Sequence, residues 1–322
     1  MCHFLLVLVW CIAQMIQPFV SVIVPVFNDS ERLKKCLYAL EKQTYPQQLY
    51  EVIVVDNGSD EEQDTKGVVN QFSQAIVVYE SRPGAYVARN KAISLAKGDV
   101  IAFTDADCIP ATDWIEKGVA NLLSVPNCGL VAGKIEYFFK EPDKPTTVEF
   151  YDSLMGIAQK RFIALNYGAT ANVFTFKSVI DKVGNFDETL KSSGDSEWGK
   201  RVFAAGYKQI YADDTCVAHP ARSSYGQINK QMRRITGGWH DMRKKEGYSG
   251  FGLVKDIVTL DLKPPVKTIF RLFVGQQIFP WAEGSAKGIT QKLEFLYVMV
   301  FIRAVVISER IRLYMGGDSK RA

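Results

Sequence analysis

The stretch from Asp99 to Asp107, which reads DVIAFTDAD, constrains the fold of this chain more than any other. Its apolar run, Val100–Phe103, is short and bounded by polar residues, which is typical of a buried parallel strand. Asp105 and Asp107 follow this run, and open α/β sheets bind ligands at the carboxyl ends of their strands. Side chains two residues apart on extended backbone point the same way, so this pair can converge on one cation, or on a cation and a ribose. Most Asp-x-Asp sequences are solvated turns, so the surrounding chain has to decide the matter.

Segments typical of strands and of helices alternate around this stretch. Apolar residues at helical spacing predict a helix beginning near Ser30, which can cap it, and another over Ala85–Lys97, ended by Gly98. This alternation favours a mostly parallel α/β sheet flanked by helices. Short apolar runs predict three further strands, at Phe19–Val26, Glu51–Asp56 and Ala75–Tyr79.

Carboxylates fall at the ends of two of these predicted strands. Asp56 closes one strand, and Asp105 and Asp107 follow another. Because the carboxyl ends of parallel strands meet at one edge of a sheet, we expect all three at a single rim. The alternative is that Asp56 and Asp60, on either side of a turn, only cap a helix.

Beyond Pro110 the alternation loosens, and we divide a main domain over residues 18–248 into halves at 18–110 and 111–248. Strands are expected at Gly129–Phe139, Ala171–Phe176, Tyr207–Tyr211 and Thr215–Ala218. Helices are expected at Asp113–Val125, Thr147–Leu165, Lys177–Val183, Gly194–Ala205 and Tyr225–Lys245.

Composition excludes some classes of protein and leaves the chain ends distinctive. A net charge of +4 over 322 residues is too small to indicate nucleic-acid binding, and the six cysteines show no metal or disulfide spacing, so they are expected to be reduced. Residues 1–17 form a hydrophobic segment that makes a poor signal peptide and is too short for a comfortable span. We interpret it as a monotopic anchor or a docking segment.

Residues 249–322 are predicted to be a helical, membrane-associated region. Lys292, Arg303 and Arg310 fall on nearly one helical stripe beside the apolar run Phe295–Ile307, as an interfacial helix on an anionic membrane requires. The alternative is an amphipathic helix docked on the catalytic domain or on a dimer partner, which leaves a homodimer open.

Several motifs in order resemble those of family-two glycosyltransferases, over roughly residues 19 to 240. The motifs are Val22–Asn28 (VIVPVFN), Val52–Asp60 (VIVVDNGSD), Ala88–Asn90 (ARN), Gly98-Asp99, Phe103–Asp107 (FTDAD), Phe186–Glu188 and Gly194–Glu197 (GDSE). The resemblance implies a GT-A fold, in which a nucleotide-binding α/β half is fused to an acceptor-binding half. It also implies an enzyme of the hexosyltransferase class.

The resemblance assigns roles to individual residues of this chain. In the nucleotide pocket it implies Pro25, Phe27, Asn28, and either Asp56 or Asn57 at the base or ribose. Around the diphosphate it implies Arg89, with Asp105 at the ribose and Asp107 and His219 on a divalent cation. The implied catalytic base is Asp195. The alternatives are purely structural roles: a surface ion pair for Arg89, a helix N-cap for Asp195 and a core histidine for His219.

The chemistry of glycosyl transfer agrees with these implied roles. A nucleoside diphosphate leaves only when its charge is neutralised, which Mg²⁺ or Mn²⁺ does, and an imidazole ligand favours Mn²⁺. A carboxylate must take the proton of an acceptor hydroxyl, and one base opposite the leaving group gives inversion. Glu197, two residues after Asp195 on a helix, would point elsewhere.

We therefore expect an inverting transfer from a UDP-sugar to a cell-envelope glycan, polysaccharide or lipid-linked sugar, at the cytoplasmic face of the cell membrane. The alternative is a catalytically silent, membrane-bound nucleotide-sugar-binding protein. Gln231–Ile235 is similar to a degraded Q-x-x-R-W motif of processive members, whose tryptophan Ile235 replaces. This favours addition of a single sugar, with Arg233 and Arg234 either contacting the diphosphate or forming a solvated basic face.

Overall fold

The computed structural model describes residues 17–247, 269, 271–272 and 288–320. Within them the strands form one eight-stranded sheet in the order β3-β2-β1-β4-β7-β6-β8-β5. Neighbours from β3 to β4 are parallel, β7 is antiparallel to both β4 and β6, and β8 is parallel to β6. The strands are β1 (Val20–Val26), β2 (Tyr50–Asp56), β3 (Ala75–Tyr79), β4 (Val100–Thr104), β5 (Ile109–Pro110), β6 (Cys128–Phe138), β7 (Asn172–Phe176) and β8 (Lys208–Pro220).

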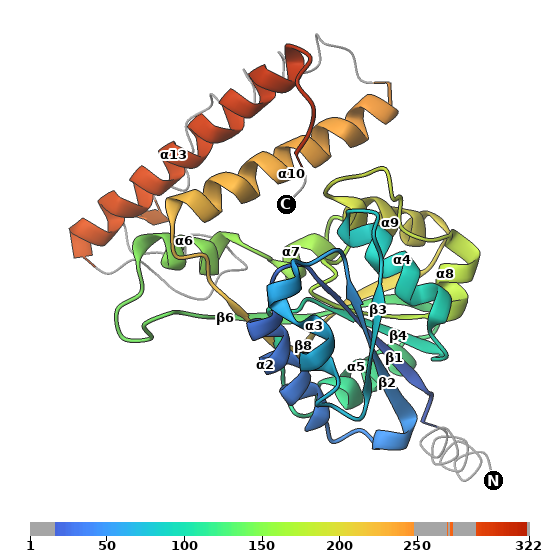
Figure 1. Cartoon of the computed structure of the whole chain (residues 1–322). Coiled ribbons are helices and arrows are strands. Elements are labelled where there is room, and N and C mark those ends of the chain that lie inside the picture. Colours follow the sequence, from blue (N-terminus) through green and yellow to red (C-terminus); the bar gives the residue numbers. More distant parts are fainter. Residues whose placement is uncertain (1–16, 248–268, 270, 273–287, 321–322) are drawn as a thin grey trace, which may run out of the picture.

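Helices cover both faces of this sheet (Figure 1). Along β1 the side chains alternate, so Val22 and Val24 pack in a core with α2 and α5, whereas Ile23 packs in a second core with α4, α8 and α9. The helices are α2 (Ser30–Glu41), α3 (Thr65–Val69), α4 (Ala85–Leu95), α5 (Trp114–Ser124), α6 (Thr147–Met155), α7 (Gln159–Ile163), α8 (Lys177–Val183), α9 (Gly194–Ala204), α10 (Tyr225–Lys245) and α13 (Gly288–Tyr314).

The predicted α/β class is confirmed, and both predicted halves contribute strands to the one sheet. Strands β1 to β4 agree with prediction to within one residue, β5 was not predicted, and α10 has the predicted bounds. Residues 1–16 and most of 249–287 lie outside the described residues, so the predictions for them are not addressed.

Three expected helix ends differ from the structure, each because a distant partner intervenes. Asp29 occupies the N-cap position of α2, and the Ser30 hydroxyl donates to Gln63 instead. α4 ends before Gly98, whose amide donates to the Ser21 hydroxyl and whose missing side chain would overlap the Ser21 backbone. The predicted helix over 147–165 breaks at Gly156, where the backbone leaves the helical conformation and the next amide, that of Ile157, donates to the hydroxyl of Tyr137 at 2.5 Å.

The two short strands expected at 207–211 and 215–218 are one long strand, β8. It pairs with β6 on both sides of an irregularity in register between Gly133 and Lys134, where Ala212 is followed by Cys216 as the next partner. A bulge therefore absorbs the extra residues and lets the strand continue. This continuation carries β8 to the carboxyl-end rim of the sheet.

The C-terminal helix α13 lies alongside α10 at one end of the molecule (Figure 1). Phe295, Val298 and Ile302 form a third core with residues of α6 and α10. This docking on the main domain agrees with the alternative that the sequence left open for the basic, apolar C-terminal helix. Among the described helices, none combines the length and apolar character needed to cross a bilayer.

Candidate active site

Strand β5 brings together residues that are 112 positions apart, Asp107 and His219. Ile109 of β5 pairs with Ala218 of β8, so the loop just before β5 lies beside the residue just after Ala218. The Asp107 Oδ1 and His219 Nε2 atoms are 3.7 Å apart. The Cys108 Sγ completes a group of three ligand atoms within 4.8 Å of one another. Asp107 and His219, the predicted metal ligands, therefore do meet.

The chemistry of this group fits a divalent cation. The Nδ1 of His219 lies 2.8 Å from the Pro220 carbonyl oxygen, so we assign the ring proton to Nδ1, which turns the Nε2 lone pair toward Asp107. Burial raises the pKa of Asp107 despite the opposing effects of His219 and Arg32, and the charge of Asp105 raises it further. A carboxylate oxygen and an imidazole lone pair that face each other repel, and a proton or a cation between them removes this repulsion.

Burial also decides what Cys108 does beside this pair. The burial of its thiol and the negative charges of Asp105 and Asp107 raise its pKa well above the usual value. A thiol ligates metal as the thiolate, a form that burial disfavours here. Its Sγ lies 3.8 Å from the Ala171 carbonyl oxygen, as expected of a small buried neighbour.

A second cluster is built on Arg89 of α4. Its guanidinium is only 5% exposed and its Nη2 donates to Asp105 Oδ1 at 2.6 Å. The ion pair considered for Arg89 is therefore present, but its arginine is buried, whereas the side chain of Asp105 is 33% exposed. Within the described chain the Arg89 Nε has no hydrogen-bond partner, although a buried donor normally has one.

Asp195 is the second residue of α9, and it does not cap that helix. The N-cap position belongs to Ser193, whose backbone is left-handed with φ 64°. Burial raises the pKa of Asp195, while the charges of Arg89 and Arg234 lower it and that of Asp105 raises it. Asp195, the predicted base, therefore lies close enough to Arg89 and Asp105 for their charges to shift its pKa.

The predicted nucleotide residues lie along the same rim. Pro25 is opposite Val55 in the β1–β2 register, and the next residue after β1, Phe27, is 56% exposed. Asn28 follows with a positive φ of 50°, and its side chain exchanges hydrogen bonds with Asp60 at 2.9 and 2.8 Å. Asp60 thus holds the loop after β1 and does not cap a helix with its side chain.

Asp56 and Asn57 sit two strands along the rim from Asp105, because β1 lies between β2 and β4. The Asp56 carboxylate accepts the amide of Ser59 at 2.8 Å and retains lone pairs for a ligand. The Asn57 amide is committed to the next loop. It donates to the carbonyls of residues 80 and 82 and accepts the Gly84 amide at 2.7 Å. Of the two residues left open by the sequence, the geometry favours Asp56 for contact with a base or ribose.

Sequence reasoning missed Tyr86, whose hydroxyl lies 3.4 Å from Asp195 Oδ1. It stands three residues before Arg89 on α4, a helical spacing that places both on one face and could have revealed it. Of the two arginines considered for the diphosphate, Arg233 instead pairs with Glu309 of α13 at 2.6 Å. Arg234 acts electrostatically on Asp195.

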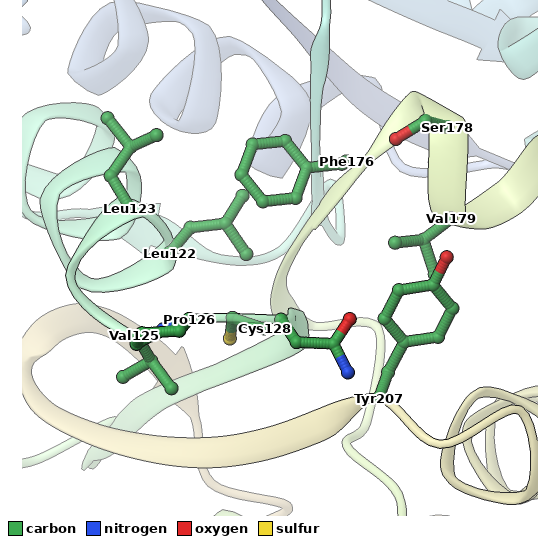
Figure 2. Close-up of a pocket in the computed structure, with 10 residues that line it drawn as sticks. Leu122, Leu123, Val125, Pro126, Cys128, Phe176, Ser178, Val179 and Tyr207 are labelled. Carbon is green, nitrogen blue, oxygen red and sulfur yellow. The ribbon is translucent and has the colours of Figure 1, made fainter. Parts of the chain in front are cut away.

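The pocket drawn in Figure 2 lies at the ends of the strands opposite the acid cluster. It is lined by residues at the beginning of β6 and the end of β7, including Cys128 and Phe176. Phe176 pairs with Val100, the first residue of β4, and the acids follow the opposite end of that strand. This pocket, about 340 Å³, is therefore separate from the acid cluster.

Comparison with known proteins identifies the class that this sheet and rim define. The model of the family described as "Glycosyl transferase family 2" matches residues 21–184. The chain belongs to this family and is a glycosyltransferase that acts on a nucleotide sugar.

Individual relatives and one solved structure add detail. The chain is 41% identical over 224 residues to "Glycosyltransferase AglE" of Haloferax volcanii, covering 68% of this chain and 72% of that protein. It is 27% identical over 210 residues to "Pre-mycofactocin glycosyltransferase" of Mycobacterium tuberculosis, covering 63% and 43%. The fold is similar to that of the mannosyltransferase PcManGT from Pyrobaculum calidifontis in complex with GDP-Man and Mn²⁺. The TM-score is 0.59 at 17% identity, with 92% and 87% of the chains covered. This likeness establishes the GT-A type of fold.

Proposed function

We propose that this chain transfers one sugar with inversion from a nucleoside diphosphate sugar to an acceptor hydroxyl, with Asp195 as the base. The observation that carries the proposal is the convergence of separate segments at one rim. Arg89 joins Asp105 by a 2.6 Å ion pair and interacts with the charge of Asp195. The next acid, Asp107, meets His219 in turn. A donor seated over Asp105 would thus have a cation site on one side and a base on the other.

The chain's own residues would divide the reaction between them. Asp107 and His219 would hold a divalent cation, Mn²⁺ or Mg²⁺, which when bound neutralises the departing diphosphate. Asp195 would take the proton of the acceptor hydroxyl. The hydroxyl oxygen would attack the anomeric carbon as the bond from that carbon to the diphosphate breaks. Glu197 is held 2.6 Å from Arg201 in an ion pair, which supports a single displacement without a second carboxylate.

The donor is proposed to be a UDP-sugar, and the acceptor a hydroxyl of a cell-envelope glycan, polysaccharide or lipid-linked sugar. PcManGT was solved in complex with GDP-Man, which makes GDP-mannose the direct competitor. The experiment is to incubate the purified chain with a panel of UDP- and GDP-sugars and Mn²⁺, and to measure release of the nucleotide. Release from a UDP-sugar that is lost in Asp195→Asn supports the choice of donor and of base. Release from GDP-mannose alone would overturn the choice of donor, and equal release by Asp195→Asn would overturn the base.

We further propose that α13 places the enzyme peripherally on the cytoplasmic face of the cell membrane. Ile289, Leu293, Tyr297 and Val300 recur at helical spacing on this helix, and each is more than half exposed. Sedimentation with anionic vesicles tests this. Leu293→Glu combined with Val300→Glu should reduce bound protein about tenfold or more, while Glu31→Gln on α2 should not. Equal sedimentation of all three proteins, or none with any of them, would contradict attachment through α13.

A further inference from the structure

Tyr86 connects α4 to the beginning of the helix that carries Asp195. Its side chain is 8% exposed, and its ring stacks on that of Phe186 with 5.7 Å between the ring centroids. The Tyr86 hydroxyl accepts the backbone amide of Gly194 at 2.8 Å and lies 3.4 Å from Asp195 Oδ1. One hydroxyl therefore contacts two successive residues of α9.

The direction of the second hydrogen bond follows from the first. A phenol has one proton, and a lone pair of the Tyr86 oxygen already accepts the Gly194 amide, so the proton is free to point at Asp195. Burial raises the pKa of Tyr86, and the charge of Asp195 raises it further, so the hydroxyl keeps this proton. The Tyr86 hydroxyl is thus a donor to the Asp195 carboxylate.

Close packing fixes the position of this donor. A Cβ on Gly194 would lie 2.7 Å from the Tyr86 ring, so only glycine lets the first turn of α9 approach so closely. The same oxygen of Asp195, Oδ1, also accepts the Ser196 amide at 3.0 Å. Both donors therefore act on Oδ1 and leave Oδ2 without either of them.

We propose that Tyr86 is a positioning residue for the base: its hydroxyl holds Oδ1 of Asp195 so that Oδ2 can take the proton of the acceptor. This rests on the proposed function of Asp195. The groups that act on Asp195 come from several elements, and the effect of Tyr86 has to be separated from theirs. They are Arg89 on α4, Arg234 on α10, Asp105 after β4, and Tyr167 before β7.

The test compares Tyr86→Phe with the full-length wild-type chain, using the nucleotide sugar that the donor panel identifies. The variant keeps the ring and its stacking but loses the donor. We expect kcat to fall about tenfold with KM for the donor within about twofold, because only the base is affected. The acidic limb of the rate against pH should move to higher pH by about half a unit to one unit, because a hydrogen bond to the charged form is lost.

The matched control is Tyr50→Phe, which removes another buried hydroxyl with a single backbone partner, the Leu40 carbonyl, at the far end of β2. Its pH limb and kcat should equal those of the wild type. Adding Tyr86→Phe to Asp195→Asn should lower the rate no further, because the hydroxyl then has no base to position.

Two results would overturn the proposal. One is an acidic limb at the same pH in Tyr86→Phe as in the wild type. The other is a loss of rate on adding Tyr86→Phe to Asp195→Asn that equals its loss in the wild-type background. A wild-type rate for Asp195→Asn would instead overturn the proposed function itself. Thermal unfolding of each variant separates these outcomes from loss of the fold.

Discussion

Carboxylates in two regions of the molecule, one buried and the others half-buried, have opposite environments. In the helical region, Glu309 of α13 is fully buried and accepts from Arg233 at 2.6 Å and from Arg312 at 3.0 Å. The hydrogen bonds from Arg312 contribute most to lowering its pKa. At the rim, burial raises the pKa of both Asp107 and Asp195. The same chemical group is thus fully paired in one region and incompletely paired in the other.

The difference distinguishes carboxylates that stabilise the fold from carboxylates that are available for catalysis or metal binding. A buried carboxylate with strong donors on both oxygens contributes to the fold, whereas one without them has unfavourable burial that a proton, cation or substrate can relieve. At Asp107 the side chains of Arg32 and His219 come no nearer than 3.6 and 3.7 Å, well beyond hydrogen-bond length. Incomplete pairing of acids is therefore the physical signature of the site, and the following experiments break or sharpen this contrast.

The largest expected effect comes from Asp195→Asn. Loss of the base should lower kcat by about 10³- to 10⁴-fold while the free energy of unfolding stays the same or rises, because an uncompensated buried charge is removed. Steady-state rates and urea unfolding measure the two quantities. Glu197→Gln, two residues later on α9, is the matched control and should stay within about fivefold in rate. A comparable loss in both variants would show that the helix, and not the base, is disturbed.

The next effect concerns the cation. His219→Gln should raise the Mn²⁺ concentration needed for half-maximal activity by at least about tenfold, because it removes one of the two ligand side chains. Chelation with EDTA should abolish activity in the wild type, and added Mn²⁺ should restore it. His240→Gln on α10 serves as the control. An unchanged Mn²⁺ titration in His219→Gln would remove this residue from the cation site.

A smaller effect is expected when the paired acid is altered. Glu309→Gln should lower the free energy of unfolding by about 1–3 kcal/mol, less than for a fully enclosed pair because Arg233 and Arg312 are 30% and 34% exposed. Its kcat should stay within about twofold. Urea unfolding provides the measurement, with Glu31→Gln, in an exposed pair with Lys35, as the control at under about 0.5 kcal/mol. A catalytic defect as large as that of Asp195→Asn would erase the contrast between the regions.

The smallest effect is the pH dependence of stability, and its sign differs between the regions. Glu309 has a folded pKa below its ordinary 4.5, so its stabilisation is present above that pH and is lost as pH falls through the folded pKa. Asp195 has a folded pKa above its ordinary 3.8, so stability falls as pH rises from there through the folded pKa. Between about pH 4 and pH 7, part of the wild-type free energy of unfolding should decrease as pH rises, and Asp195→Asn should lack this decrease; urea unfolding measures it. If the variant instead lacked an increase with pH, our description of the environment of Asp195 would be reversed.

The sequence predicted β1 to β4 and most of the helix ends to within one residue, and it missed one cap and two helix ends for a physical reason. A buried parallel strand is a local apolar run, and β1, β2 and β4 could be read directly from theirs. The ends of α2 and α4 depend on Gln63 and Ser21, partners that adjacent sequence does not reveal. The break at Gly156 likewise involves the hydroxyl of Tyr137, 19 residues earlier.

The site was predictable where residue type dictates chemistry. Asp105 and Asp107 could be chosen because two carboxylates after a strand suit a cation, whereas His219 was implied by the resemblance to family-two glycosyltransferases. The structure brings Asp107 and His219 together. Glu309 could not be chosen, because its role depends on partners that only tertiary packing supplies, and the one local sign of Tyr86 is its helical spacing to Arg89. The commitment of Asn57 to the loop around Gly84 is of the same kind.

The pairing of β5 with β8 has a consequence for synthesis of the chain. Residues up to Pro110 leave the ribosome carrying the nucleotide rim and Asp107, but Ala218 and His219 emerge more than 100 residues later. A nascent chain at that stage has Asp107 but lacks His219, so the pair proposed to hold the cation is incomplete. Metal binding by this pair would therefore require that translation has passed β8 and that this strand has docked.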